Sequence, residues 1–488
     1  MRRTMVFTSL EFAVFFGVVL ALNWRLKSDA LLYPPFLLAA NLIFYGLGAP
    51  GFVPLLLAVA LANWFTAKIM FRTNSQKTRK LYLALDVCLC LGLLFFFKYF
   101  EFGLEMLERL GLAGGLLARF QLPEIIYPIG MSFFTFQGLS LAIDHYRNPE
   151  LEPPDLLSAL NFVSFFPTVL SGPIQRAKDF IPQMHSVKYD PENFNMAVVL
   201  ILSGLFKKIA LSSYLSENIV RQVFQVPESF GAAGVWAGIY GYGAQIYLDF
   251  SGYSDLALGI GLLLGYNVGV NFNAPYLATN IRDFWHRWHI SLSTWLRDYL
   301  YISLGGNRRG FKSLNLFLTQ LLGGLWHGAH LRYVIWGAAH GLALVVSHFF
   351  NDRFKARQRR LAEMGLRPWQ RQPPRYQGAR RFFGFLLTFN FVSLMWILFR
   401  AEDSARAWEV TRAAMDFARE GDSASTLVWL IIGLTLFMQL AGGEIRNRFL
   451  KLQTKLPEPL LAVWCAFWVV IILKLGPEGV LPFIYFQY

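Results

Sequence analysis

The sequence predicts an all-α protein that is embedded in a membrane and crosses it many times. Of its 488 residues, 55% are apolar and only 16% are charged, whereas a soluble domain has about 45–50% apolar and about 25% charged residues. The apolar residues form long runs, and about 20 such residues make a helix that crosses a bilayer. These runs leave room for roughly 11–13 membrane helices, some short or re-entrant, in one membrane-embedded domain over residues 1–488.

The chain opens with four apolar runs that predict four membrane spans, at residues 5–24, 31–48, 52–71 and 81–100. The first run is too long for the apolar region of a signal peptide and lacks a small-residue cleavage motif, so we expect an uncleaved span. The next segment, 102–120, carries several glutamates and predicts an amphipathic helix at the membrane interface.

Helix-breaking and polar stretches separate the spans predicted in the middle of the chain. A short span opens at Pro128, and the apolar run 156–175 ends in the helix-breaking sequence Ser171-Gly172-Pro173. Residues 176–193 predict a polar loop. Three apolar segments follow, at residues 194–215, 232–249 and 252–266.

The pattern changes over residues 271–310. This segment is rich in Trp, His, Arg, Asp, Asn and Ser and has no apolar run of spanning length, although long apolar segments flank it. Irregular backbone survives at membrane depth only where protein or a water-filled cavity surrounds it. We therefore expect these residues to line an internal cavity on short or re-entrant helices.

The remainder of the chain returns to apolar runs around one basic stretch. Runs at 314–326 and 331–350 predict two helices, and residues 351–381 predict a basic cytoplasmic loop. Further spans are expected at residues 381–399, 425–441 and 459–475. No internal repeat is visible, which argues against a transporter built from duplicated halves.

The charge balance fits the same class of protein. Lys and Arg number 45 against 31 Asp and Glu, a net charge of +14. Because basic residues gather in cytoplasmic loops, we expect the basic stretch 351–381 to lie in the cytoplasm together with Arg72, Lys77, Arg79 and Lys80. A nucleic-acid partner is not expected. Three cysteines without CxxC or zinc-ligand spacing predict neither a disulfide nor a metal site.

Six of the eight histidines fall between residues 286 and 348. Ionisable residues inside a membrane protein are costly and usually functional, and histidine exchanges protons near neutral pH, which suits a general base. His286 and His289 are three residues apart, as are His327 and His330, so each pair could share a helix face and bind a metal. Structural histidines that bond helix backbones are a further alternative.

Asp249, Ser251 and Asp255 lie in an otherwise apolar region, where a lone charge would be expensive. We expect them to line the cavity or to pair with one of the arginines at positions 282, 287 and 297.

Several motifs resemble those of one known family. The longest runs from Phe284 through Trp-His-Arg-Trp-His-Ile-Ser-Leu-Ser to Gly-Gly-Asn-Arg308. It is flanked by Tyr247-Leu-Asp-Phe-Ser-Gly-Tyr-Ser-Asp255, Asn271-Phe-Asn-Ala-Pro-Tyr276 and Leu322-Gly-Gly-Leu-Trp-His-Gly-Ala329. Shorter matches are Pro128-Ile-Gly, Ser171-Gly-Pro-Ile174, Ile335-Trp-Gly-Ala-Ala-His-Gly341 and the tail Pro482-Phe-Ile-Tyr-Phe-Gln487. Together they closely resemble the membrane-bound O-acyltransferase (MBOAT) family, especially its bacterial branch.

The resemblance implies a ring of helices around a central tunnel in which channels from both membrane faces meet, with residues 271–341 as the catalytic core. His327 matches the catalytic histidine of the family. His289 matches its second functional position, which is His in the bacterial branch and often Asn or Asp elsewhere. Close relatives have Arg at the position of His286, which argues against a four-histidine metal site.

Neighbouring side chains are expected to support these histidines. The tryptophans Trp285, Trp288 and Trp326 are expected to pack the tunnel. A polar group, Arg297, Asp298 and Tyr299, is expected to hold the cavity wall by ion pairs and hydrogen bonds.

A glycine-rich stretch offers a site for an acyl donor. After Gly305 and Gly306 come Asn307, Arg308 and Arg309, which combine free backbone N–H groups with two cations. Such a stretch could hold the phosphates of a donor. It equally fits a plain turn on the cytoplasmic face.

The resemblance implies an O-acyltransferase of the bacterial inner membrane. The implied donor is cytoplasmic acetyl-CoA, no cofactor is permanently bound, and the acetyl group serves O-acetylation of an exopolysaccharide such as alginate. The implied partners are periplasmic acetyltransferase proteins, the exopolysaccharide acceptor and membrane lipid. D-alanyl transfer to teichoic acid, a non-enzymatic transporter and a metal-dependent membrane hydrolase are the alternatives.

Overall fold

The computed structural model describes residues 5–111, 125–186, 189–308, 311–364 and 374–476. These residues form helices joined by loops, and none of them belongs to a strand. By length and composition, six of the helical segments could cross a membrane: Pro50–Arg72, Gln76–Glu108, Pro191–Gln225, Leu331–Glu363, Gly378–Arg400 and Thr426–Gln453. The prediction of an all-α polytopic membrane protein is confirmed.

The amino-terminal helices follow the four predicted runs. They are α1 (Leu10–Leu26), α2 (Tyr33–Gly48), α3 (Val53–Arg72), which the short η1 (Pro50–Phe52) precedes, and α4 (Gln76–Arg109). The Ser9 and Ser75 side chains cap α1 and α4 by accepting hydrogen bonds from backbone N–H groups. Because α4 continues to Arg109, the separate interfacial helix predicted from residue 102 is wrong up to that point; residues 112–120 lie outside the described residues.

Four shorter helices follow: α6 (Met131–Arg147), α7 (Leu156–Ser164), α8 (Phe166–Val169) and α9 (Ala177–Met184). The apolar run predicted over 156–175 breaks at Phe165, since Pro167 fits the first turn of a new helix and not the middle of one. Part of the predicted polar loop 176–193 is the helix α9.

The next helical segment combines α and π turns. It consists of α10 (Pro191–Leu205), η2 (Phe206–Ser212), α11 (Ser213–Leu215), η3 (Ser216–Val220) and α12 (Arg221–Gln225), and the short η4 (Pro227–Ser229) follows it. Both η2 and η3 are π-helical. Such turns are rare and frequently mark functional or strained positions.

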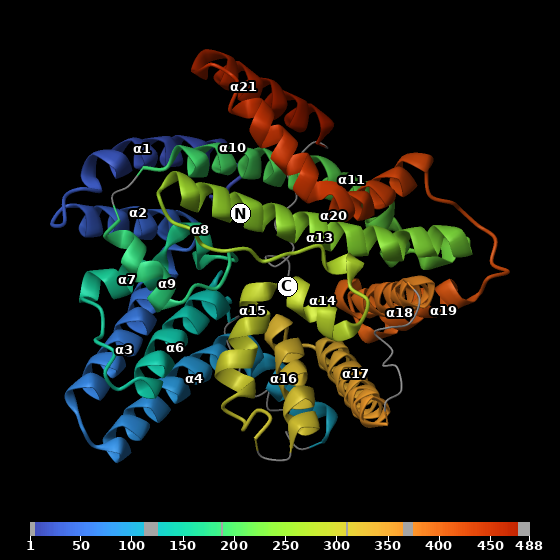
Figure 1. The fold of residues 1–488 in the computed structure, drawn as a ribbon, viewed down its shortest axis with the longest axis horizontal. Helices are drawn as coiled ribbons and strands as arrows, with labels where there is room; N and C mark the ends of the chain where they lie inside the picture. Colours follow the sequence, from blue (N-terminus) through green and yellow to red (C-terminus); the bar gives the residue numbers. More distant parts are fainter. Residues whose placement is uncertain (1–4, 112–124, 187–188, 309–310, 365–373, 477–488) are drawn as a thin grey trace.

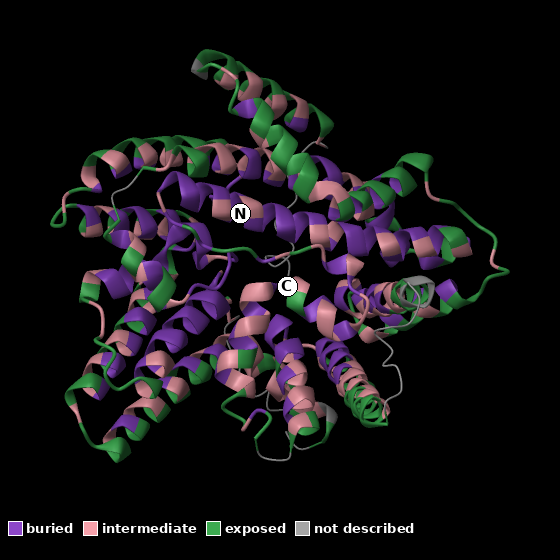
Figure 2. Cartoon of the chain, viewed as in Figure 1, coloured by how far each residue is buried: buried purple, intermediate pink, exposed green. Residues whose placement is uncertain are grey.

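The helix α13 (Ala232–Leu263) is buried over most of its length (Figure 2). The sequence predicts two spans here, 232–249 and 252–266, and this prediction is wrong because Gly252 does not interrupt the helix. Gly252 instead lets α10 approach closely: a Cβ atom at this position would lie 2.9 Å from the carbonyl oxygen of Gly204. Small residues at such crossings bring helix backbones together in membrane proteins.

Two lysines of η2 pair with the acids of α13. Lys208 Nζ contacts Asp249 Oδ1, and Lys207 Nζ lies 2.5 Å from Asp255 Oδ2. The prediction that Asp249 and Asp255 pair with an arginine is therefore wrong. Charges inside a protein are retained where they are paired, so the ion pairs fasten η2 to α13.

Short helices occupy residues 271–310, as predicted. They are η5 (Pro275–Leu277), α14 (Ile281–Arg287), α15 (Ile290–Trp295) and the π-helical η6 (Leu296–Tyr301). The hairpin of α16 (Lys312–His327) and α17 (Leu331–Glu363) follows.

The last helices are α18 (Pro374–Arg400), α19 (Ser404–Met415), α20 (Thr426–Gln453) and α21 (Glu458–Leu475). The basic stretch predicted as a loop over 351–381 is helical up to Glu363, where α17 ends, and again from Pro374, where α18 begins. Residues 365–373 lie outside the described residues. The sequence did not predict α19.

Longer helices surround the short ones (Figure 1). In this view α14 and α15 lie near the centre, α13 passes above them, and α16 and α17 descend below. The sequence predicts roughly 11–13 membrane helices, whereas six described segments are long and apolar enough to cross a membrane. Part of this difference comes from α1, α2, α6 and α16, which have only 16 or 17 residues. A central tunnel stays a prediction.

Candidate active site

Three buried histidines lie at the centre of the helical assembly. His289 and His340 are fully buried, and His327 is 7% exposed. His289 directly precedes α15, His327 is the last residue of α16, and His340 lies on α17. The segment 271–341 thus delivers all three imidazoles from different helices.

Aromatic rings alternate with the three imidazoles. The centroid of the Trp326 ring lies 5.9 Å from that of His289 and 4.9 Å from that of His327. The Trp336 centroid lies 5.2 Å from that of His327 and 4.4 Å from that of His340. The two functional positions implied by the resemblance, His289 and His327, therefore both pack against one indole.

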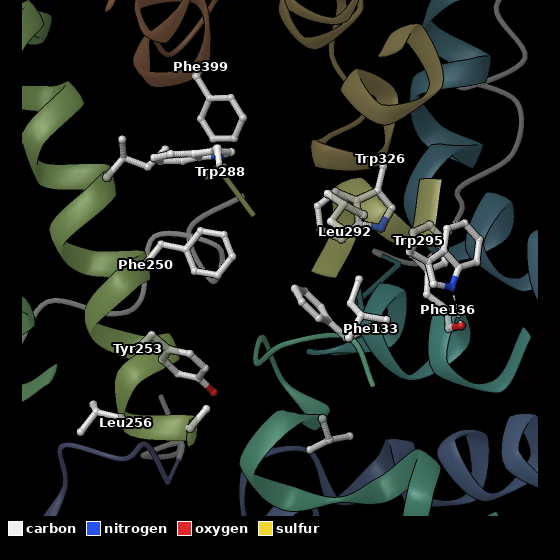
Figure 3. Packing of buried hydrophobic residues seen from close by; sticks show 14 of the residues in the cluster. Phe133, Phe136, Phe250, Tyr253, Leu256, Trp288, Leu292, Trp295, Trp326 and Phe399 are labelled. Atoms are coloured by element: carbon white, nitrogen blue, oxygen red, sulfur yellow. Dashed lines mark hydrogen bonds between the residues drawn. The ribbon is translucent and has the colours of Figure 1, made fainter. Parts of the chain in front are cut away.

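The imidazole of His289 also bridges two parts of the fold. Its centroid lies 4.6 Å from that of Phe250 on α13, in an edge-on arrangement. In Figure 3, Phe250 on α13 lies on the left and Trp326 on α16 lies on the right. Because His289 contacts both rings, it lies between α13 and α16.

The backbone at His289 adopts a rare conformation. Its φ angle is 43°, in the left-handed region that residues other than glycine seldom occupy. Asn271 holds the turn: its carbonyl oxygen accepts from the N–H of Ile290 (2.9 Å), and its Oδ1 accepts from the N–H of Ser291 (3.2 Å). The Ser291 hydroxyl accepts in turn from the N–H of Ile174 (3.0 Å). Backbone strain of this kind concentrates at functional sites.

Both ring nitrogens of His289 lack a hydrogen-bond partner among the described residues, and the same holds for His340. Both nitrogens of His289 are therefore available to hydrogen-bond a substrate group. An imidazole among aromatic rings favours its neutral form, because a buried charge without a partner is costly. A neutral imidazole offers one donor and one acceptor.

Glycines place His327 by close packing. A Cβ atom at Gly328 would lie 2.3 Å from Cε2 of Tyr333, and one at Gly324 would lie 2.4 Å from the carbonyl oxygen of the same residue. The motif around His327 therefore needs glycine on both sides for steric reasons, since α16 and α17 touch backbone to backbone there.

We expect Gly328→Ala to lower the unfolding temperature of the protein. The added methyl group has no space beside the buried Tyr333 ring, and overpacking of this kind costs about 1–3 kcal/mol. The measurement is thermal unfolding of the detergent-solubilised protein. Gly433→Ala on α20 is the matched control, because nothing lies within 4 Å of a Cβ atom there. Equal unfolding temperatures for the two variants would contradict the expected clash.

The two members of each histidine pair do not share a helix face. His286 is exposed whereas His289 is buried, because α14 ends at Arg287 and the chain turns before α15. His330 precedes α17, and its Nδ1 accepts from the N–H of Arg332 (3.4 Å), as in a helix cap. Within the described residues no group of three or more His, Cys, Asp or Glu side chains could hold a metal ion.

The predicted tryptophans lie in the aromatic shell around the histidines. Trp285, Trp288 and Trp326 are at most 9% exposed. The centroid of Trp285 lies 5.3 Å from that of His340, while Trp288 packs against Trp396 at 5.0 Å. Of these three, Trp326 is the one that touches both His289 and His327.

The polar group predicted to hold the wall lies in η6, away from the imidazoles. The Tyr299 hydroxyl donates to the Asp144 carboxylate (2.9 Å), and Arg176 lies over the Tyr299 ring at 4.5 Å. Arg297 Nε donates to Asp298 Oδ1 at 2.7 Å, and this hydrogen bond raises the pKa of the Arg297 guanidinium. The contacts of Tyr299 fasten η6 to α6 and to the start of α9.

The stretch offered as a donor site forms a turn between η6 and α16. Gly305 and Gly306 have φ angles of 109° and 54°, which favour glycine. The Tyr301 hydroxyl donates to Oδ1 of Asn307 (2.6 Å), and Arg308 is exposed. Arg309 lies outside the described residues. The whole of α16, about 24 Å long at 1.5 Å per residue, separates this turn from His327.

Contacts between helix ends bring the basic segments to one face. Arg79, in the first turn of α4, donates to the carbonyl oxygens of His145 (2.7 Å) and Tyr146 (3.0 Å) at the end of α6. Arg147 donates to Ser303 Oγ (3.1 Å) beside the Gly305 turn. At the start of α16, Lys312 pairs with Asp352 of α17 (2.9 Å). The turn that carries Arg308 therefore shares a face with the start of α4 and the basic end of α17.

A cavity of about 250 Å³ lies elsewhere, between the ends of α1 and α13 and the start of α10. Its lining includes Trp24, Tyr189, Asn193 and Asn267 and none of the three histidines.

Comparisons with known proteins agree with these features. Residues 55–397 match the model of the MBOAT, membrane-bound O-acyltransferase family. The chain is 34% identical over 484 residues to a probable alginate O-acetylase of Pseudomonas putida, covering 93% of this chain and 94% of that one. It is 36% identical over 431 residues to a probable alginate O-acetylase of Pseudomonas aeruginosa, with coverages of 86% and 78%. A peptidoglycan O-acetyltransferase of Helicobacter pylori is 33% identical over 407 residues, with coverages of 77% and 72%.

Proposed function

Because the chain belongs to the membrane-bound O-acyltransferase family, we propose that it transfers an acetyl group from cytoplasmic acetyl-CoA across the bacterial inner membrane for O-acetylation of an exopolysaccharide such as alginate. It is a multi-pass membrane O-acyltransferase. The observation that carries the proposal is the row of buried imidazoles joined by Trp326 and Trp336, in which His289 keeps both nitrogens without a partner among the described residues.

The proposed chemistry is direct acyl transfer. His327 accepts the proton of the acceptor hydroxyl while its oxygen attacks the thioester carbonyl carbon. The carbon–sulfur bond then breaks, and the thiolate leaves with the proton that His327 returns. One ester forms and one thioester is consumed, so atoms and charge balance without an oxidant or a metal.

His289 is proposed to stabilise the oxyanion. A neutral imidazole can donate one hydrogen bond to the acyl carbonyl oxygen, and this bond strengthens as negative charge develops in the tetrahedral intermediate. The left-handed turn fixed by Asn271 holds the ring in place, so little reorganisation accompanies the reaction. His289 lies between Phe250 and Trp326, where water has little access.

The basic face supports cytoplasmic entry of the donor. Positively charged segments of membrane proteins lie on the cytoplasmic side, and the face that carries the start of α4 and the basic end of α17 also carries Arg308. An extended donor with phosphates at one end and a thioester at the other suits a site that is separated from His327 by the length of α16.

We expect Arg308→Ala to raise the KM for acetyl-CoA by about tenfold and to leave kcat unchanged. The reason is that a guanidinium bound to a donor phosphate stabilises the bound substrate and the transition state equally, so its removal weakens binding alone. The measurement is the initial rate of acetyl transfer against donor concentration. Arg412→Ala is the matched control, since this exposed arginine lies on α19, which packs against the start of α13. An unchanged KM would remove Arg308 from the donor site.

The proposal for the acceptor is based on proteins that are similar to this chain. Two similar proteins are described as probable alginate O-acetylases and a third as a peptidoglycan O-acetyltransferase, so the shared chemistry is acetylation of a carbohydrate hydroxyl. We propose that periplasmic acetyltransferase partners carry the acetyl group onward to the polymer. Family membership favours an enzyme over the transporter alternative.

The test uses inside-out membrane vesicles that contain the full chain. Radiolabelled acetyl-CoA is added outside, and label is followed into carbohydrate or protein that is sealed inside. Label that crosses only when the protein is present supports the proposal. Label that follows a D-alanyl donor and not acetyl-CoA, or flux of unreacted donor, would contradict it.

A further inference from the structure

Lys98 is one of two charged residues in the apolar run 81–100 of α4, and the other is Asp86. Lys98 lies within the segment Gln76–Glu108, which is long and apolar enough to cross a membrane. A cation at such a position is expensive, and it is retained where it has a partner and a role. Neither the family resemblance nor the chemistry above assigns Lys98 a role.

The partner of Lys98 is the end of the helix that carries His327. Lys98 Nζ donates to the carbonyl oxygen of Trp326, and the neighbouring Tyr99 hydroxyl donates to that of Leu325 at 2.7 Å. The ammonium group also lies 5.8 Å from the centroid of the Trp326 ring. Two consecutive residues of α4 thus hold two consecutive carbonyl groups of α16.

These carbonyl groups belong to the last turn of α16, where intrahelical donors run out. The carboxyl end of a helix carries partial negative charge, and a cation there is stabilising. The last residue of this turn is His327 itself.

The same kind of bond occurs far from the histidines. Lys27 Nζ donates to the carbonyl oxygens of Leu264 (2.6 Å) and Gly265 (3.4 Å), at the end of α13. Lys27 therefore caps a helix end and lies over aromatic rings, as Lys98 does, but away from the three histidines. Lys98 differs because the turn that it caps contains Trp326 and His327, whose rings contact each other. Trp326 also contacts His289, and His327 also contacts Trp336.

We propose that Lys98 is a positioning residue: with Tyr99 it fixes the last turn of α16 so that the His327 imidazole meets the acceptor hydroxyl and the acyl carbonyl. The inference rests on the proposed function and deepens it. A misplacement of about 1 Å can cost a reaction about 10²-fold, so the bond from α4 sets the rate and not the affinity for the donor.

The test compares Lys98→Met, Lys98→Arg and Lys27→Met as full chains in inside-out vesicles, with rates normalised to folded protein. We expect Lys98→Met to lower kcat for acetyl transfer by about 10–10²-fold while the KM for acetyl-CoA stays within about twofold. Lys98→Arg keeps a charged donor and should recover most of kcat. Lys27→Met removes an equivalent cap at another helix end and should keep the wild-type kcat.

The opposite results overturn the inference. An unchanged kcat in Lys98→Met, or an effect that lies wholly in KM or in the amount of folded protein, would show that Lys98 only anchors the fold. Should Lys98→Met fail to accumulate, Tyr99→Phe carries the test, because it removes the neutral bond to Leu325; an unchanged kcat there overturns the inference as well.

His327→Ala measured alongside separates this inference from the proposed function. An active His327→Ala variant would refute the function, whereas an inactive His327→Ala with a fully active Lys98→Met would refute the role of Lys98 alone.

Discussion

His327→Ala is expected to lower the rate of acetyl transfer by about 10²–10⁴-fold, the contribution of a positioned general base. The imidazole lies at the end of α16, packed against Trp326 and Trp336, and its removal leaves the acceptor hydroxyl without a group to take its proton. Membrane insertion should be retained, because alanine is favourable at the last position of α16. The measurement is kcat at saturating donor, together with the amount and unfolding temperature of the protein.

His286→Ala is the matched control for this variant. His286 belongs to the same histidine-rich segment, but its side chain is exposed whereas His327 is buried. It should transfer acetyl at the wild-type rate. Near-normal transfer by a well-folded His327→Ala protein would refute the assignment of the base.

His289→Ala is expected to lower kcat by about 10²–10³-fold, the usual effect of removing an oxyanion donor. The substitution also places alanine at a φ angle of 43°, which L-residues other than Asn, Asp and Gly rarely adopt. His289→Asn retains a donor and tolerates this backbone, so it should recover part of the rate. The measurement is again kcat at saturating donor for each variant.

His289→Gly separates the two effects in His289→Ala. Glycine adopts the left-handed conformation without cost, but it supplies no hydrogen bond. We therefore expect the Gly variant to be free of the backbone strain of the Ala variant and to be as inactive as the Ala variant. A fully active Gly variant would show that the imidazole of His289 has no part in the reaction.

Much of the architecture follows from the sequence, because membrane spans leave a clear mark. Long apolar runs predicted α1 to α4, and the polar segment 271–310 predicted the short helices that hold His289. The predictions of helix boundaries failed where the same sequence feature is compatible with two structures. The apolar segments 232–249 and 252–266 predict two spans, but α13 continues through Gly252, which serves close packing. The basic stretch after residue 350 predicts a loop, but α17 continues to Glu363.

The site was only partly predictable for a different reason. The motifs identified His289 and His327, and their spacing suggested a shared face with His286 and His330, which the turn before α15 and the cap of α17 rule out. His340 and Lys98 were missed because their importance depends on contacts between helices that are remote in the chain. The signal for Lys98 was nevertheless present, since it is a charge inside an apolar run.

The most direct measurement is a structure of the protein with a ketone analogue of acetyl-CoA, in which a methylene group separates the sulfur from the carbonyl carbon. Such an analogue keeps the carbonyl group but cannot transfer it. The account predicts the carbonyl oxygen of the analogue within about 2.7–3.2 Å of a His289 ring nitrogen, with His327 facing the carbonyl carbon. An acyl group bound in the cavity beside Trp24 and Tyr189, or on any surface remote from the row of imidazoles, would contradict it.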